Sequence, residues 1–122
     1  MISEREFRSP DGQEAGIYVM SVAARLCKMH PQTLRKYERA GLLTPSRSGG
    51  HRLYSDRDIA RLQMIKTLVE DGGLNLAGVE LALDIHASVT RLSERIAALP
   101  IEEGLKSQLE HELEAILKLL KL

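Results

Sequence analysis

The stretch MHPQTLRKYERAGLL, residues 29–43, concentrates side chains that make directed hydrogen bonds. Gln32 can pair with an adenine edge in the major groove of DNA, and Arg35 or Lys36 with guanine. These residues and Thr33 fall at or near the first turn of the helix that Pro31 is suited to start. The pattern predicts a recognition helix, and the alternative is an ordinary amphipathic surface helix.

Two short helices must position this stretch. Ser21 is a good N-cap, and the segment SVAARLCK places Val22, Ala23 and Leu26 on one face of a first helix. The residues MHP then break that helix before Pro31, and Leu34 and Tyr37 would anchor the second one. Two helices joined by a turn of three or four residues, with small Ala24 where they cross, predict a helix-turn-helix.

A basic hairpin is predicted next. Gly41 should end the second helix, and LLTPSRSGGHRLY has the composition of two extended pieces around a Gly-Gly turn. Arg47, Arg52 and Tyr54 would place this wing against the DNA backbone, where guanidinium groups match phosphate geometry. The alternative is a hairpin whose charges are simply solvated.

Two further helices complete the head. Ser55 followed by Asp58 predicts a reciprocal N-terminal cap for a third helix, and Asn75 predicts the cap of a fourth over residues 76–85. The fold expected is mostly α: a winged helix-turn-helix of four helices and a hairpin over residues 17–86, followed by C-terminal helices.

The net charge of zero hides a strong asymmetry along the chain. Residues 17–70 contain ten Lys and Arg against four Asp and Glu, whereas residues 71–122 contain five against nine. A basic segment joined to an acidic one suits a nucleic-acid-binding head with a separate interaction tail, although a solvated helix face can collect the same charge.

In this order the motifs resemble the DNA-binding domain of the MerR family of transcription regulators. The matching stretches are SVAARLCK, HPQTLRKYERAGLLTPSR, GGHRLYSDRDIARLQMIKTL and NLAGVELAL, and the resemblance covers residues 18–86. Within that family, MHPQTLRKYERAGLL and NLAGV are most similar to the HspR-type heat-shock repressors. The resemblance implies that Tyr37 touches a DNA phosphate and that His51 stands where most members have a tyrosine before the wing arginine.

Two departures from the family pattern bear on function. The turn between the first two helices usually carries a glycine, but this chain has Lys28, which would be strained in a left-handed conformation. The metal-sensing branch uses cysteines beyond the fourth helix, and Cys27 is the single cysteine here. We therefore expect no metal sensing and no cofactor, and we interpret Cys27 as a small buried hydrophobic residue.

The tail, residues 87–122, carries two apolar seams separated by Pro100 and Gly104. We expect a broken helix rather than one continuous coiled coil, and we expect dimerisation there. Folding of both seams back onto the head is the alternative. The seam residues are Val89, Leu92, Ile96 and Leu99, then Leu109, Leu113, Ile116 and Leu120.

Other functional classes find little support. The first residues are charged where a secretory signal would be apolar, and no apolar run is long enough to cross a bilayer, so we expect a cytoplasmic protein. Residues 1–16 suggest a flexible arm. No nucleophile is paired with a base, and the four histidines lack metal-ligand spacing, so we expect neither an enzyme nor a metal site.

The sequence thus predicts a homodimer that binds double-stranded DNA at an inverted repeat, as a repressor of heat-shock or chaperone genes. Resemblance to the HspR type implies the DnaK chaperone as co-repressor. Residues 87–122 leave no room for an effector domain, so we expect the signal to come from a partner or from the tail. The alternatives are a MerR-like adaptor that binds a co-chaperone instead of DNA, and an activator that distorts its promoter.

Overall fold

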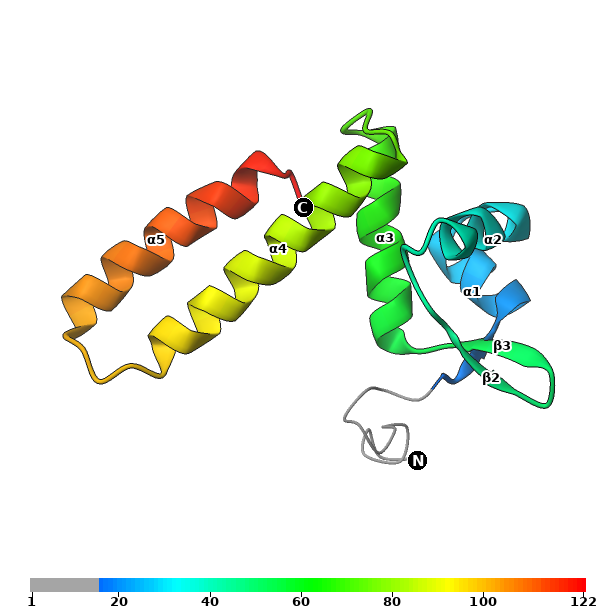
Figure 1. Cartoon of the computed structure of the whole chain (residues 1–122), viewed down its shortest axis with the longest axis horizontal. Helices are drawn as coiled ribbons and strands as arrows, with labels where there is room; N and C mark the ends of the chain where they lie inside the picture. Colours follow the sequence, from blue (N-terminus) through cyan, green and yellow to red (C-terminus); the bar gives the residue numbers. More distant parts are fainter. Residues whose placement is uncertain (1–15) are drawn as a thin grey trace. The chain divides into compact units, whose positions relative to one another are not determined.

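The structure is a computed structural model that describes residues 16–122 (Figure 1). The expected flexible arm lies outside the described residues except for Gly16, whose N–H donates to Ser46 Oγ at 3.2 Å. The chain divides into two compact units between Met64 and Ile65. This division falls within helix α3 (Asp56–Glu70), whereas the expected domain boundary after residue 86 lies inside helix α4 (Leu76–Ala97).

The first unit begins with the predicted helix pair, α1 (Met20–Cys27) and α2 (Pro31–Arg39). Helix α1 starts one residue before Ser21, so the prediction of a Ser21 cap is wrong; Val19 is the N-cap and makes no side-chain cap bond. The buried face of α1 consists of Ala23, Ala24 and Cys27. Leu26, which was predicted to lie on that face, is 48% exposed, because Ala23, Ala24 and Cys27 centre the buried arc of the helix to one side of it.

The turn between α1 and α2 keeps a left-handed residue although it lacks glycine. Lys28 has φ 54° and ψ 49°. The Lys28 N–H donates to the Arg25 carbonyl and the Met29 N–H to the Ala24 carbonyl, at 3.2 and 2.9 Å, which is the Schellman arrangement that closes many helices. The hydrogen bonds of the turn are therefore conventional, and the steric strain arises from the Cβ of Lys28 in the left-handed conformation.

A small antiparallel sheet forms the wing. Strands β2 (Ser46–Ser48) and β3 (His51–Tyr54) are joined through Gly49 and Gly50, whose φ angles of 57° and 80° suit a tight hairpin. A third strand, β1 (Tyr18–Val19), was not predicted and pairs with β3, giving the order β1-β3-β2. The wing is therefore fixed to the segment that leads into α1.

Helix α3 begins with the predicted reciprocal cap. The Asp58 N–H donates to Ser55 Oγ at 3.0 Å, and the Ser55 N–H donates to Asp58 Oδ2 at 2.9 Å. Arg61 Nε donates to the Leu42 carbonyl, which fixes the segment after α2 to α3. The buried hydrophobic residues of this unit are Ala23, Ala24, Cys27, Leu34, Tyr37, Leu42, Leu43, Tyr54 and Leu62.

The second unit is dominated by two long helices, α4 and α5 (Glu103–Leu119). Asn75 caps α4 as predicted, because its Oδ1 accepts the Gly78 N–H at 2.8 Å. The expected end of this helix near residue 85 is wrong: α4 continues to Ala97, since no glycine or proline follows Gly78 before Pro100. Pro100 lies between the two helices.

Helices α4 and α5 pack against each other within the chain, and Figure 1 shows them as an antiparallel pair. Val89 and Ile96 of α4 meet Leu113 of α5 in a buried cluster that Ile85, Leu109 and Leu117 flank. Ser93 Oγ donates to Glu110 across the pair. The two predicted seams thus contribute much of their apolar surface to one another.

Candidate nucleic-acid interface

Helix α2 is capped at its N-terminus by His30, a role that was not predicted for any histidine. His30 Nδ1 accepts the backbone N–H of Gln32 at 3.1 Å, and Pro31 occupies the first helical position. These two residues satisfy or remove N–H groups that a helix start leaves without partners. The first turn that carries Gln32 and Thr33 is consequently well fixed.

The two faces of α2 separate its anchoring residues from its polar ones. Leu34 is 0% exposed and Tyr37 is 6% exposed, so both hold the helix on the first unit. Gln32 and Lys36 are exposed, and Thr33 and Arg35 are half-buried. Four of the predicted recognition residues therefore retain surface for a ligand, whereas Tyr37 contributes chiefly as a core aromatic residue.

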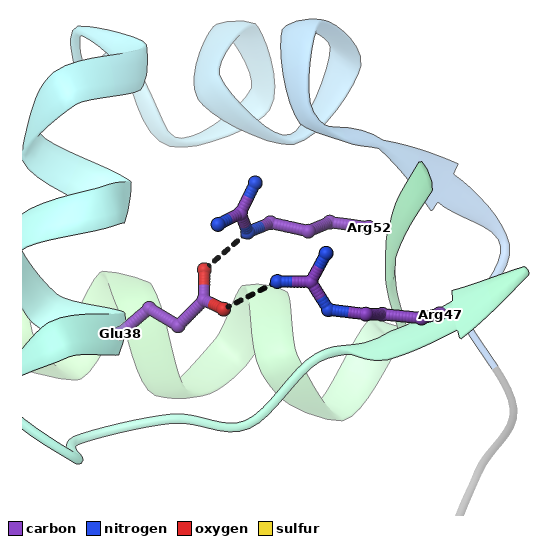
Figure 2. A network of polar contacts seen from close by, with 3 residues as sticks. All are labelled: Glu38, Arg47 and Arg52. Carbon is purple, nitrogen blue, oxygen red and sulfur yellow. Dashed lines mark hydrogen bonds and ion pairs between the residues drawn. The ribbon is translucent and has the colours of Figure 1, made fainter. Parts of the chain in front are cut away.

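The two wing arginines face each other across the hairpin. Arg47 of β2 and Arg52 of β3 are register partners, and both reach toward Glu38 of α2 (Figure 2). Arg52 Nε donates to Glu38 Oε2 at 2.5 Å, and Arg47 donates through one Nη to Glu38 Oε1 at 3.5 Å. Each carboxylate oxygen thus bonds to one strand of the wing.

This arrangement leaves the terminal groups of Arg52 available. Only its Nε is used by Glu38, and within residues 16–122 neither Nη group has a hydrogen-bond partner. A guanidinium fork of this kind matches the oxygens of a phosphate. His51 is exposed at the start of β3, beside the Gly49–Gly50 turn.

Tyr54 is not available to DNA, and its assignment as a contact is wrong. The side chain is 0% exposed, and its hydroxyl has no hydrogen-bond partner among the described residues. Burial, and secondarily the charge of Glu38, raises the pKa of Tyr54 above its usual 10.0. Tyr54 ends the wing strand beside the buried Ser55, so it anchors the wing instead of extending from it.

Two residues of this region were missed at the sequence level. Glu38 was interpreted only as a residue of the second helix, and its bonds to Arg47 and Arg52 depend on contacts with the wing that no local sequence pattern shows. Tyr18 donates its hydroxyl to Asp56 Oδ1 at 2.7 Å, and that bond raises the pKa of Tyr18. The Tyr18 bond joins β1 to the start of α3 and supports the base of the wing.

Neither a membrane helix nor a metal cluster is found in the part of the chain that the structure covers. No helix over residues 16–122 combines the length and apolarity needed to cross a bilayer. No group of three or more His, Cys, Asp and Glu side chains that could hold a metal ion occurs in the same residues.

The sequence is similar to those of known transcription regulators and of a heat shock protein. HspR of Streptomyces coelicolor, which is named as a heat shock protein, is 44% identical over 88 residues, covering 71% of this chain and 58% of that protein. The transcriptional regulator GlnR of Bacillus anthracis is 30% identical over 109 residues, covering 88% and 79%. The chain thus spans little more than half the length of HspR but most of GlnR.

A solved structure supports the same fold. The lead(II) complex of the transcription regulator PbrR691 from Ralstonia metallidurans superposes with a TM-score of 0.53 and covers 86% of this chain and 83% of that one. At 24% identity this likeness concerns the fold alone. The profile of the MerR HTH family regulatory proteins matches residues 18–84, which contain the helix pair, the wing and the capped third helix. The chain belongs to the MerR family of helix-turn-helix regulatory proteins.

Proposed function

We propose that the protein is a homodimeric, sequence-specific DNA-binding transcription regulator. The observation that carries the proposal is the separation of roles on α2, where Leu34 and Tyr37 are buried and Gln32 and Lys36 are exposed. Glu38 of the same helix bonds to the two wing arginines. Gln32, Thr33, Arg35 and Lys36 would read base edges in the major groove. Arg47, His51 and Arg52 would contact the phosphate backbone.

Phosphate contacts supply affinity and base contacts supply the address in this scheme. The described part of the basic segment, residues 17–70, carries an excess of six positive charges. Neutralising phosphates with these groups releases counterions, so binding to any duplex should weaken as salt rises. Selectivity should depend on α2, because its first turns carry Gln32, Thr33, Arg35 and Lys36, whose side chains can discriminate bases.

A second copy of the chain is the proposed occupant of the remaining apolar surface of α4 and α5. Val89, Ile96 and Leu113 are buried within the chain, and Leu109 and Leu120 are half-buried, so these five offer little surface to a partner. Leu92, Leu99 and Ile116 remain 40–48% exposed. MerR-family regulators are typically dimers, and a dimer matches an inverted repeat with two recognition helices.

The proposal for the regulated genes depends on similarity to HspR. We propose repression of heat-shock or chaperone genes in the cytoplasm, with the DnaK chaperone as a co-repressor that unfolded protein titrates away. This step depends on likeness to a relative of which the chain covers 58%. Transcription from a promoter carrying the selected site, with and without DnaK, tests it: repression that DnaK strengthens is expected, and activation would indicate the promoter-distorting alternative.

An adaptor that binds a co-chaperone instead of DNA is the second candidate. Loss of the basic groups would favour it, but Arg35, Arg47 and Arg52 are all present. Selection of binding sites from a pool of random duplexes at moderate salt separates the two. Enrichment of an inverted repeat is expected, and recovery of unenriched sequences together with a tight protein partner would overturn the DNA-binding function.

A further inference from the structure

Glu38 holds two like charges that the fold brings face to face. Arg47 and Arg52 are directly opposed in the β2–β3 register, and like charges in such pairs repel each other. The Glu38 carboxylate lies between them, one oxygen to each arginine (Figure 2). The side chain of Glu38 is 20% exposed, against 30% for Arg52 and 55% for Arg47, so the bond to Arg52 is the better shielded of the two.

The same carboxylate connects two elements that would contact DNA in different ways. Glu38 is on α2, six residues after Gln32, whereas the arginines are on the wing. A short charge-assisted hydrogen bond has a narrow range of geometries. The bond to Arg52 therefore fixes the guanidinium relative to the helix that presents the base-reading residues.

The bond is also directed so that it does not use up the arginine. Glu38 takes the Nε hydrogen of Arg52 and leaves both Nη groups for an anion. Yet a carboxylate beside this surface repels every phosphate, so its net electrostatic effect on DNA binding is unfavourable. Glu38 thus orients Arg52 while it lowers the positive charge of the surface. Such a residue favours binding in one register on DNA over tight binding to every duplex.

We propose that Glu38 is a specificity-determining positioning residue, which sets the register between the phosphate-binding wing and the base-reading first turns of α2. The inference depends on the proposed DNA-binding function and adds the residue that couples its two halves. It predicts an unusual outcome: loss of Glu38 leaves binding to unrelated DNA unchanged or tighter, while preference for the cognate site falls.

The experiment compares binding of each variant to a site selected by the unchanged protein from random duplexes and to a shuffled duplex of the same length. Glu38→Ala should reduce the ratio of the two affinities about tenfold, the order of one lost base contact. Glu38→Gln retains an acceptor oxygen for Arg52 but not the charge. It should keep most of the preference and bind the shuffled duplex as tightly as Glu38→Ala does.

Three controls separate positioning from charge, from effects that bypass Arg52 and from folding. Glu70→Gln removes a negative charge at the exposed end of α3 and should leave the ratio unchanged. In a protein that already carries Arg52→Ala, the further change Glu38→Ala should cause no additional loss of preference, because Glu38 acts through the position of Arg52. Thermal unfolding of every variant verifies that the folded protein is being compared.

The outcomes are distinct. A Glu38→Ala protein that binds both duplexes more weakly by the same factor, or that keeps its full preference, would overturn the positioning role while leaving the proposed function intact. If Glu38→Ala does not fold, Glu38→Gln decides alone. A Glu38→Gln protein that binds both the selected and the shuffled duplex more weakly by the same factor would count against the inference. Absence of any selected site for the unchanged protein would overturn the proposed function and this inference together.

Discussion

His30 Nδ1 accepts the backbone N–H of Gln32, the residue proposed to read an adenine edge, at 3.1 Å. His30→Ala removes this acceptor from the start of α2, and loss of an N-cap lowers the free energy of unfolding by about 1 kcal/mol. Operator affinity should fall as well, because the first turn frays. Urea unfolding and a binding titration measure both effects. His30→Asn retains an acceptor and should restore most of the loss; equal damage from both substitutions would contradict the capping role.

Lys28 is predicted to be a site of backbone strain. Its φ of 54° brings the Cβ close to the following carbonyl, whereas glycine adopts this conformation without that contact. Lys28→Gly should keep the free energy of unfolding or raise it by up to about 1 kcal/mol, the gain being offset by the entropy of glycine in the unfolded chain. Lys28→Val should lower it. If valine were tolerated as well as glycine in urea unfolding, the left-handed turn would be wrong.

Arg52 and Gln32 should fail in different ways. Arg52→Ala removes a phosphate contact, so binding to all duplexes should weaken and the slope of log affinity against log salt should decrease by about one unit. Gln32→Ala should cost about 1–3 kcal/mol on the cognate site and little on other DNA. Titrations at several salt concentrations distinguish the two. An unchanged salt slope for Arg52→Ala would remove the wing from the interface.

Tyr54 should limit stability at alkaline pH. Because burial raises the folded-state pKa above the unfolded value of 10.0, the neutral ring stabilises the fold below pH 10, and this stabilisation is lost as pH rises beyond that value. Tyr54→Phe removes the titrating hydroxyl, which has no partner among the described residues, and should make the loss above pH 10 less steep. Tyr18 continues to titrate, so some loss should persist.

At neutral pH the same substitution should keep the free energy of unfolding or raise it by up to about 1 kcal/mol, because a buried hydroxyl without a hydrogen bond is unfavourable. Urea unfolding across the pH range measures both parts. A marked loss of stability in Tyr54→Phe at neutral pH would indicate that the hydroxyl has a partner, such as bound water.

The dimer should depend on exposed leucines instead of the buried cluster. Charging Leu92 and Ile116 together, as Leu92→Glu with Ile116→Glu, should yield folded monomers by sedimentation, because both side chains are 40–48% exposed and form no part of the Val89–Leu113 cluster. Leu26→Glu, at an equal 48% exposure in α1, is the matched control and should leave the dimer intact. An intact dimer in the double variant would place the interface elsewhere.

Sequence reasoning succeeded where structure is decided within a few residues. The Ser55–Asp58 cap, the Asn75 cap, Pro31 at the helix start and the Gly49–Gly50 turn each depend on local backbone chemistry, and each occurs as predicted. The uninterrupted course of α4 to Ala97 was also readable, since no proline or glycine lies between position 86 and Ala97, but the helix was predicted to end near residue 85.

The failures concern contacts between distant segments. Strand β1 has only two residues, which is too short for an alternating sequence pattern. It is a strand because it pairs with the edge of β3. Tyr54 was assigned to DNA contact together with Arg47 and Arg52 of the wing, but its side chain is buried in the core of the first unit. Glu38 likewise acquires its role only when the hairpin register opposes Arg47 to Arg52.

The pairing of β1 with β3 also constrains the order of folding. The Ile17 N–H donates to the Tyr54 carbonyl at 3.0 Å, so the two segments that enclose the whole helix-turn-helix close a loop on one another. The entropy of closing that loop falls once the intervening helices have shortened the path between its ends. Completion of the wing should thus be a late event, and the Ile17 amide should lose its protection from hydrogen exchange as soon as that loop reopens.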